Sequence, residues 1–419
     1  MREMKDSGIE WVGNIPAHWK VERLQWHVSE IKDSNKPEKT RQVLSLTNKR
    51  GVIPYEEKGA QGNVAKEDYS QYKLAYPGTI VANSMNILIG SVGRCDYYGC
   101  VSPVYYVYKP NEGENLEFIS FMFQMEQFQK DLRRYANGIL EIRLRVSSDG
   151  ILKREMAFPP IDEQERIVEC LGLKCSQVDD LIANVQAQIE KLKAYRLSVV
   201  IETVTKGLDT DVKMKNSGVE WIGEIPATWD TVRVKQLLHE RKERSVEGKE
   251  EPLSMSQKVG LVPTKTLDAI PNPASSYVGA KLTYVNDLVF NKLKAHLGVF
   301  SVSKYDGLVS PDYAVYYSTG VVDLKYLEYL FKTPQCISEF RKRSTGIAAG
   351  LTRLYTDGLF AIECPLPPKD EQQAIVAYLD EKWAQIDRLI AIKQAKIEKL
   401  EQYKKSLIYE YVTGKKEVV

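Results

Sequence analysis

The stretch SGIEWVGNIPAHW at residues 7–19 returns as SGVEWIGEIPATW at residues 217–229. Nine of the thirteen positions are identical, including both tryptophans and the proline. Because chance does not place two tryptophans and a proline in register twice, the chain carries an internal duplication. Self-similarity of this kind decides how the whole fold is organised.

The duplication continues along the rest of the chain. LSLTNKRGVIP (44–54) matches LSMSQKVGLVP (253–263), and PPIDEQERIV (159–168) matches PPKDEQQAIV (367–376). The offset falls from 210 to 208 residues, which two one-residue deletions in the second copy explain. A period near 208 residues is far too long for a solenoid, so we expect two tandem copies of one unit.

Length and composition are those of a globular protein. The chain has 419 residues, of which 43% are hydrophobic and 27% charged, enough for two or three domains with real cores. It has no apolar run of about 18 residues and no secretory signal, which predicts a cytoplasmic protein without a membrane span. With a net charge of only +2, any nucleic-acid contact needs locally concentrated positive charge. The six cysteines and four histidines lack the spacing of a zinc site.

The first ~155 residues of each half are rich in short β-like runs broken by Gly, Pro and Asn. TIVAN (79–83) and YAVYYS (313–318) are examples. One helical stretch follows in each half, at 116–136 and 324–344. This alternation predicts a mixed α+β domain in each copy.

Two Pro-Pro stops then precede acidic helix starts, and acidic side chains in a first turn suit the helix dipole. The long helices that follow carry a heptad stripe, which Arg196, Lys393 and Lys404 interrupt. The helices could each pack on their own domain, but matched stripes favour antiparallel pairing of the two. The residues predicted to pack between the helices are Val178, Ile182, Val185, Ile189, Leu192, Val199, Ile386, Ile390, Ile397, Leu400 and Leu407.

The predicted fold class is therefore α+β. Two tandem mixed α/β domains are separated by two long helices that form an antiparallel coiled coil, in a pseudo-two-fold internal repeat. We predict recognition domains at 1–157 and 207–364, a central helical spacer at 158–206 and a C-terminal helical spacer at 365–419.

Motifs for catalysis are missing from the sequence. It has no P-loop, no GxGxxG, no HExxH, no GxSxG and no Asn/Asp-Pro-Pro-aromatic segment. The IEK strings at 189–191 and 397–399 fall inside the heptad helices and are best explained as solvated charged faces. The sequence therefore predicts a chain that binds and positions other molecules and has no catalytic, cofactor or metal residues of its own.

The paired lead-in segments (7–19 and 217–229), the paired Pro-Pro-x-Asp-Glu-Gln helix starts and the IEKL-containing helices resemble the DNA specificity (S, HsdS) subunits of type I restriction–modification systems. The resemblance covers essentially the whole chain. It implies that each globular unit is a target recognition domain that reads one half of a bipartite site in double-stranded DNA, and that the helices set the gap and dock two modification subunits. S-adenosylmethionine is then expected on the modification subunits, and ATP and Mg²⁺ on restriction subunits.

Residues that contact DNA should be Lys, Arg, Asn, Gln, Ser or His beside Gly-rich turns. For each single residue an ordinary solvated loop position is an equally good explanation; as groups they favour contact. The DNA-binding candidates are Asn48, Lys49, Arg50, Ser84, Asn86, Arg94, Arg143, Arg145, Gln257, Lys258, Lys292, Lys294, His296 and Arg353. Candidates for phosphate contact at helix ends are Arg133, Arg134, Arg341, Lys342 and Arg343, where basic side chains also suit the helix dipole.

Other interpretations remain open at this stage. The lead-in segments could brace the recognition domains against the helices or could dock the modification subunit. The whole chain could be a rod-shaped protein-interaction adaptor without a DNA role, or an autonomous enzyme with an unfamiliar site.

Overall fold

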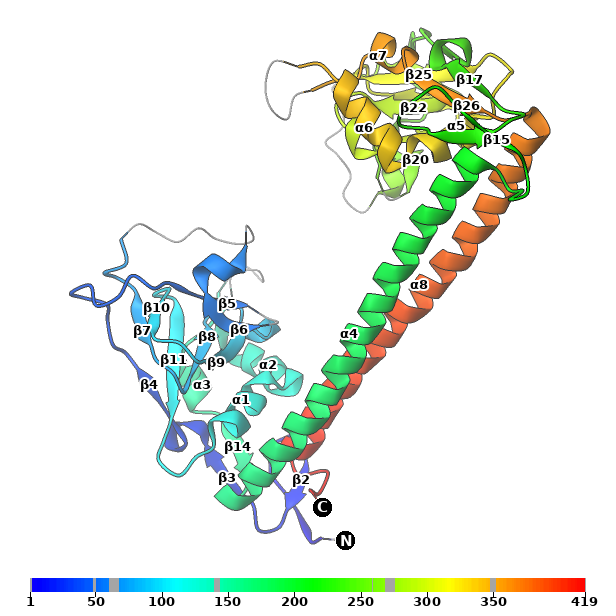
Figure 1. Cartoon of the computed structure of the whole chain (residues 1–419). Helices are drawn as coiled ribbons and strands as arrows, with labels where there is room; N and C mark the ends of the chain where they lie inside the picture. Colours follow the sequence, from blue (N-terminus) through cyan, green and yellow to red (C-terminus); the bar gives the residue numbers. More distant parts are fainter. Residues whose placement is uncertain are drawn as a thin grey trace. The chain divides into compact units, whose positions relative to one another are not determined.

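The computed structural model in Figure 1 describes residues 2–47, 50–59, 68–138, 144–257, 259–267, 276–346 and 352–418. The chain divides into two compact units. The first unit contains Met1–Gln186 and Gln394–Val419, and the second contains Ala187–Lys393. Each unit combines one globular domain with a portion of both long helices. Among the described residues, no helix is both long and apolar enough to cross a membrane.

The domain of the first unit is built on a four-stranded antiparallel sheet of order β4-β11-β8-β9. The strand β8 is completely buried and the helix α1 packs on the sheet, because TIVAN supplies the β-branched residues that suit a buried strand. The elements are β1 (Met4–Asp6), β2 (Asn14–Pro16), β3 (Lys20–Arg23), η1 (Leu24–Trp26), β4 (Val28–Ile31), β5 (Leu44–Thr47), β6 (Gly51–Pro54), η2 (Tyr55–Lys58), β7 (Lys73–Ala75), β8 (Thr79–Asn83), η3 (Ile87–Ile89), β9 (Val92–Cys95), β10 (Gly99–Val101), β11 (Tyr105–Pro110), α1 (Leu116–Gln124), α2 (Glu126–Leu132), η4 (Arg133–Tyr135), β12 (Ala136–Asn137), β13 (Arg145–Val146), α3 (Ser148–Leu152) and β14 (Glu155–Phe158).

The second unit repeats this topology with a sheet of order β18-β25-β22-β23. The elements are β15 (Met214–Asn216), β16 (Glu224–Pro226), β17 (Asp230–Arg233), η6 (Val234–Gln236), β18 (Leu238–Glu240), β19 (Leu253–Ser256), β20 (Gly260–Pro263), η7 (Thr264–Thr266), β21 (Lys281–Thr283), β22 (Leu288–Asn291), η8 (Ala295–Leu297), β23 (Phe300–Val302), β24 (Gly307–Val309), β25 (Tyr313–Ser318), α5 (Leu324–Phe331), α6 (Pro334–Arg343), α7 (Thr356–Phe360) and β26 (Glu363–Leu366). The strands predicted at 79–83 and 313–318 are confirmed as β8 and β25.

The helical stretch predicted in each half contains two helices, α1 and α2 in the first unit and α5 and α6 in the second. In the first unit Met125 is extended (φ −63°, ψ 124°) and separates α1 from α2. In the second unit Thr333 is extended, its side chain accepts a hydrogen bond from the amide of Cys336, and Pro334 occupies the first turn of α6. A cap followed by proline starts a new helix, which explains the break there.

The long helices α4 (Ile161–Lys206) and α8 (Lys369–Val412) pack together, which confirms the predicted fold class. Late residues of α4 meet early residues of α8, since Asp179 contacts Lys404 whereas Arg196 contacts Asp387. The pairing is therefore antiparallel. Of the eleven predicted packing residues, six are fully buried (Val178, Val185, Ile189, Ile386, Ile397 and Leu407) and five are half-buried (Ile182, Leu192, Val199, Ile390 and Leu400).

The polar residues that interrupt the stripe join the two helices. Lys404 donates to Asp179 at 2.6 Å and Lys393 donates to Gln188 at 2.6 Å. Arg196 bonds to Asp387 at 2.7 Å, and its guanidinium lies 5.0 Å from the centroid of the Trp383 ring. Polar positions at such an interface specify register, because a shifted pairing would leave them without partners.

Each lead-in segment is fastened to the start of a long helix. The indole N–H of Trp19 donates to Oε2 of Glu163 at 3.0 Å, and Trp229 donates to Glu371 at 2.8 Å. Both indoles are completely buried. The bracing interpretation therefore has a direct contact in both units, and this contact explains the glutamate of the repeated Asp-Glu-Gln.

The glutamine of that motif closes the junction from the other side. The side-chain oxygen of Gln164 accepts from the amide of Asn115 at 3.1 Å, and its NH₂ donates to the carbonyl of Pro159 at 3.1 Å. Gln372 makes the same two bonds, to the amide of Asp323 (2.7 Å) and the carbonyl of Pro367 (2.9 Å). Each glutamine thus ties α1 or α5 to a long helix.

The first unit also uses the last residues of the chain. Tyr409 donates to the carbonyl of Trp11 at 2.8 Å, and Lys415 donates to the carbonyls of Val12 and Asn14. Arg2 in turn donates to the carbonyl of Gly414. The end of α8 therefore packs on a lead-in segment that is more than 390 positions away in the sequence.

One buried cluster differs in kind between the copies. In the first unit the buried His27 lies 2.7 Å from Glu114 and 3.3 Å from Glu22, and its ring stacks on Phe158 with centroids 3.3 Å apart. The aligned residues of the second unit are Leu237 in place of His27, Val322 in place of Glu114 and Val232 in place of Glu22. A buried polar cluster around a histidine in one copy is thus an apolar cluster in the other.

Replacing His27 alone by Leu should lower the free energy of unfolding by about 1–3 kcal/mol, because it removes the buried hydrogen bond to Glu114 and places an apolar side chain beside that carboxylate. Converting all three positions to the residues of the second unit (Glu22→Val, His27→Leu, Glu114→Val) should return stability to within about 1 kcal/mol of the unaltered chain, because replacing all partners of a buried hydrogen bond by apolar groups can be nearly neutral. Urea unfolding measures both changes. A triple variant no more stable than His27→Leu contradicts this equivalence.

The two long helices carry one buried and one exposed isoleucine that can be compared directly. Ile189 is 2% exposed and Ile392 is 61% exposed. Ile189→Ala should therefore destabilise the chain by about 2–4 kcal/mol, whereas Ile392→Ala should change stability by less than about 0.5 kcal/mol. Chemical denaturation of the two variants side by side checks this, and equal losses would disprove the assignment of the buried face.

Candidate nucleic-acid interface

A tight turn with a similar backbone follows β8 in the first unit and β22 in the second unit. In the first unit Asn83 ends β8, and its side-chain oxygen accepts from the amide of Met85 at 3.0 Å. In the second unit Asn291 ends β22 and accepts from the amide of Leu293 at 3.1 Å. Both turns close on a left-handed glycine, since Gly90 has φ 86° and Gly298 has φ 76°. A side-chain turn and a glycine with positive φ define this frame.

The residue at the corner of each turn differs in chemistry but not in conformation. Asn86 has φ −115° and ψ 6°, and Lys294 has φ −119° and ψ 13°. Both are exposed, and neither side chain makes a hydrogen bond or ion pair among the described residues. The fold therefore presents a carboxamide in one unit and an ammonium group in the other from the same point.

An apolar side chain stands beside each corner residue. Ile89 is 68% exposed and the aligned Leu297 is 49% exposed. A single exposed apolar residue is ordinary, but these two occupy equivalent positions just before the left-handed glycines. The turn tips therefore combine one polar and one apolar group.

Two further segments meet each turn. The amide of Val146, next to Arg145, donates to the carbonyl of Ser84 at 3.1 Å, and the amide of Leu354, next to Arg353, donates to the carbonyl of Lys292 at 3.0 Å. Arg145 and Arg353 are therefore the same residue type at aligned positions. The β19–β20 hairpin joins from the other side, because the side chain of Gln257 donates to the carbonyl of Leu297 at 3.0 Å. In the first unit the β5–β6 hairpin passes so close that a Cβ on Gly93 would lie 2.7 Å from the Cα of Gly51.

The remaining turn candidates are less available. Ser84 is buried, so its side chain is not presented to solvent. Lys292, which aligns with Ser84, is half-buried. It also affects Lys281, whose pKa is lowered by burial and by the nearby charges of Lys292 and Arg244, although Glu240 partly offsets this. His296 is half-buried, and its Nδ1 has no hydrogen-bond partner among the described residues.

Several cationic candidates have carboxylate partners within their own unit. Arg94 pairs with Glu117 and, at 2.6 Å, with Asp96, and these bonds raise its pKa against the effect of burial. Arg50 lies 2.6 Å from Glu57, and Arg353 lies 3.5 Å from Asp312. Exposed pairs of this kind are worth little, so a phosphate could replace either carboxylate. The candidates Asn48, Lys49, Arg143 and Lys258 lie outside the described residues.

The cations at the helix ends lie near the lead-in segments. Arg134 bonds to Glu10 at 3.0 Å. Lys342 and Arg343 both pair with Glu339, and they line a hollow of about 690 Å³ together with Val219, Glu220 and Trp221. Arg133 and Arg341 are exposed. The described contacts therefore connect this group to the domain–helix junctions.

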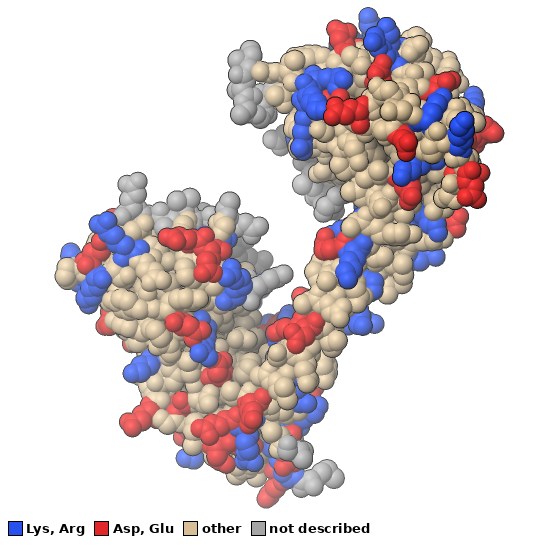
Figure 2. All heavy atoms as spheres, in the orientation of Figure 1, with Lys and Arg blue, Asp and Glu red and all other residues tan. Residues whose placement is uncertain are grey.

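Charges of both signs are interspersed on the visible surface of both units (Figure 2). This agrees with the net charge of only +2. Contact with a polyanion therefore depends on particular side chains and not on a field of one sign over a whole domain.

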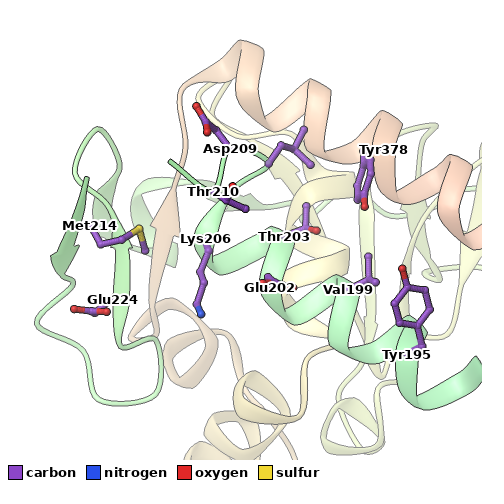
Figure 3. A pocket seen from close by; sticks show the side chains of 12 residues that line it. Tyr195, Val199, Glu202, Thr203, Lys206, Asp209, Thr210, Met214, Glu224 and Tyr378 are labelled. Carbon is purple, nitrogen blue, oxygen red and sulfur yellow. The ribbon is translucent and has the colours of Figure 1, made fainter. Parts of the chain in front are cut away.

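A separate cavity of about 620 Å³ opens at the end of α4 in the second unit (Figure 3). The residues that line it include Glu202, Asp209, Glu224, Lys206, Tyr195 and Tyr378. Within the parts of the chain that the structure describes, no three His, Cys, Asp or Glu side chains come together as metal ligands.

Sequence reasoning did not single out Ile89, Leu297, Asn83 or Asn291. Their signal was present in the duplication, because an Asn seven residues before the left-handed glycine and an apolar residue immediately before that glycine recur in both copies. Reasoning by residue type overlooked Ile89 and Leu297 because it looked only for polar groups, and it overlooked Asn83 and Asn291 because they end strands and do not lie at the turn tips.

The fold and these turns define a class: a duplicated protein whose two α+β units share a backbone frame, differ in the side chains at its tip, and are connected by two antiparallel helices. No protein-family model matches the chain. The chain is 25% identical over 428 residues to a Methanocaldococcus jannaschii protein described as the MjaX specificity subunit of a type I restriction enzyme, covering 96% of this chain and 95% of the relative. It is 24% identical over 279 residues to the type I restriction enzyme MjaVIII specificity subunit of the same organism, covering 62% of each.

Solved structures agree with this relationship at the level of the fold. A chain from a structure describing complex assembly and conformational transition of the type I R-M system superposes with a TM-score of 0.69, at 15% identity, covering 95% of this chain and 98% of that one. The HsdS subunit from Thermoanaerobacter tengcongensis superposes with a TM-score of 0.51, at 16% identity, covering 96% and 98%. The chain is thus a homologue of type I restriction enzyme specificity subunits and has the HsdS fold.

Two glycines of the first unit test the turn frame. Gly90→Ala should destabilise the chain by about 1–2 kcal/mol, because its φ of 86° is unfavourable for any residue with a Cβ. Gly172→Ala should instead stabilise it by about 0.5–1 kcal/mol, because Gly172 lies inside α4 and an added Cβ meets no atom within 4 Å. Thermal or urea unfolding distinguishes the two, and shifts of the same sign would refute the assigned conformations.

Proposed function

We propose that this chain is the DNA-sequence-specificity subunit of a type I restriction–modification complex. The domains at 1–157 and 207–364 each read one half of a bipartite site in double-stranded DNA, and the helical spacers at 158–206 and 365–419 set the unread gap. The observation that carries the proposal is the pair of turns, identical in backbone and different in the exposed corner side chain.

Physical reasoning supports this use of the fold. A protein that reads two unlike half-sites needs two binding surfaces with the same geometry and different chemistry. Arg145 and Arg353 supply the shared part, since arginine contacts phosphate and base edges alike. Asn86 and Lys294 supply the different part. In this proposal the antiparallel helices, with their register specified by polar contacts, would set the fixed spacing between the half-sites.

The chemistry of the complex would then belong to partner chains. Two modification subunits would dock on this chain, bind S-adenosylmethionine and methylate adenine, and restriction subunits, where present, would use ATP and Mg²⁺. This chain would have no catalytic residue of its own. In support, a relative that it matches over 95% of that relative's length is described as a specificity subunit.

The alternative is a protein-interaction adaptor without a DNA role. It is favoured if the assembled complex shows no salt-sensitive DNA binding, because neutralising phosphates always makes affinity fall with salt. An autonomous enzyme would instead methylate or cleave DNA without any partner.

The decisive experiment compares the methylomes of cells that express the modification partner with and without this chain. We expect methylation of a split, non-palindromic motif only when the chain is present. Replacing residues 20–157 by the corresponding segment of a relative with another specificity should change one half of that motif and leave the other half and the gap unaltered. A continuous methylated motif, or a change in both halves of the motif, would refute the proposal.

A further inference from the structure

The two corner residues, Asn86 and Lys294, have the same backbone conformation and different side-chain chemistry. Asn86 and Lys294 share their φ and ψ within about 10°, and each follows an Asn-capped strand end and precedes a short 3-10 turn closed by a left-handed glycine. The backbone therefore delivers both side chains in the same direction relative to their own sheets. Any difference in what they contact comes from the side chains themselves.

Other side chains near the turn do not offer the same contrast. Ser84 is buried, and Arg94 is already held by two carboxylates. Arg145 and Arg353 are the same residue in both units, so they cannot distinguish one half-site from the other. Within the described residues, Asn86 and Lys294 are exposed and make no side-chain bond that a base would have to displace.

Their chemistry fits different base pairs. A carboxamide both donates and accepts, which matches the N6 donor and N7 acceptor of adenine in the major groove. An ammonium group only donates, which matches the O6 and N7 acceptors of guanine. The exposed Ile89 and Leu297 beside them add an apolar surface of the kind that rests on a thymine methyl group or the edge of a neighbouring base.

We infer that Asn86 and Lys294 are specificity-determining residues, Asn86 selecting an adenine in the half-site of the first unit and Lys294 selecting a guanine in the half-site of the second unit. This inference rests on the proposed function, because it assigns base preferences within a bipartite DNA site. It places the difference between the half-sites at one structurally equivalent corner.

The test exchanges the two side chains in the complex of the full chain with its modification subunit. Methylation is measured on duplexes in which each base pair of both half-sites is varied in turn. Asn86→Lys should shift the preference from A·T to G·C at one position of one half-site, and Lys294→Asn should make the reverse change at one position of the other. Each shift should be about 5- to 150-fold, the value of one good bidentate base contact.

Two further variants keep the outcome interpretable. Asn86→Ala should relax the preference at the same single position by a similar factor while methylation of the best duplex persists. Lys304→Asn, an identical substitution at an exposed lysine at the opposite end of β23, should leave every preference unchanged. It controls for the loss of one positive charge.

The inference is overturned if Asn86→Lys and Lys294→Asn leave the base preference unaltered at every position. It is also overturned if either substitution changes preferences in both half-sites. Complete loss of methylation in both Asn86→Ala and Asn86→Lys overturns it as well. These results leave the proposed function standing as long as the unaltered chain still directs methylation to a split site. Failure of the unaltered chain to do so refutes the proposed function itself.

Discussion

Burial of the apolar stripe between α4 and α8 is the interaction on which the rest of the structure depends. Neither long helix belongs to one unit, since the first unit uses the start of α4 and the end of α8, and the second unit uses the complementary parts. An isolated helix of this composition gains little from its own backbone and is stable mainly through its packed face. The pairing of the helices therefore completes both cores.

The duplication has been preserved unevenly. Positions that join domain to helix are the same in both copies, as the tryptophan–glutamate bonds and the glutamine contacts demonstrate. The turn frames are also the same. The buried cluster around His27 has exchanged all its polar members for apolar ones around Leu237, whereas the exposed corner residues differ singly. Geometry is thus common to both copies while surface chemistry is not.

The architecture could be predicted from the sequence alone, because the internal duplication and the periodic apolar patterns specify it. The duplicated lead-in, the heptad stripe and the β-like runs all predicted elements that the structure contains. Sequence alone did not predict the structure at two kinds of position. The break at Met125 has no signal in the local sequence, since nothing there forbids a continuous helix. The burial of Ser84 and the ion pair of Arg94 with Glu117 depend on elements that are distant in the sequence, so residue type alone could not rank the candidates at the turns.

The contact of Tyr409 and Lys415 with residues 11–14 also has a consequence for biosynthesis. All residues of the second unit lie within one continuous segment, 187–393, and have left the ribosome before the first unit is complete. The first unit must wait for the last turns of α8 to cover its lead-in segment. Contacts of such long range close slowly. The domain translated first is therefore the one that finishes folding last, and until then its apolar helix face is a surface for chaperones to protect.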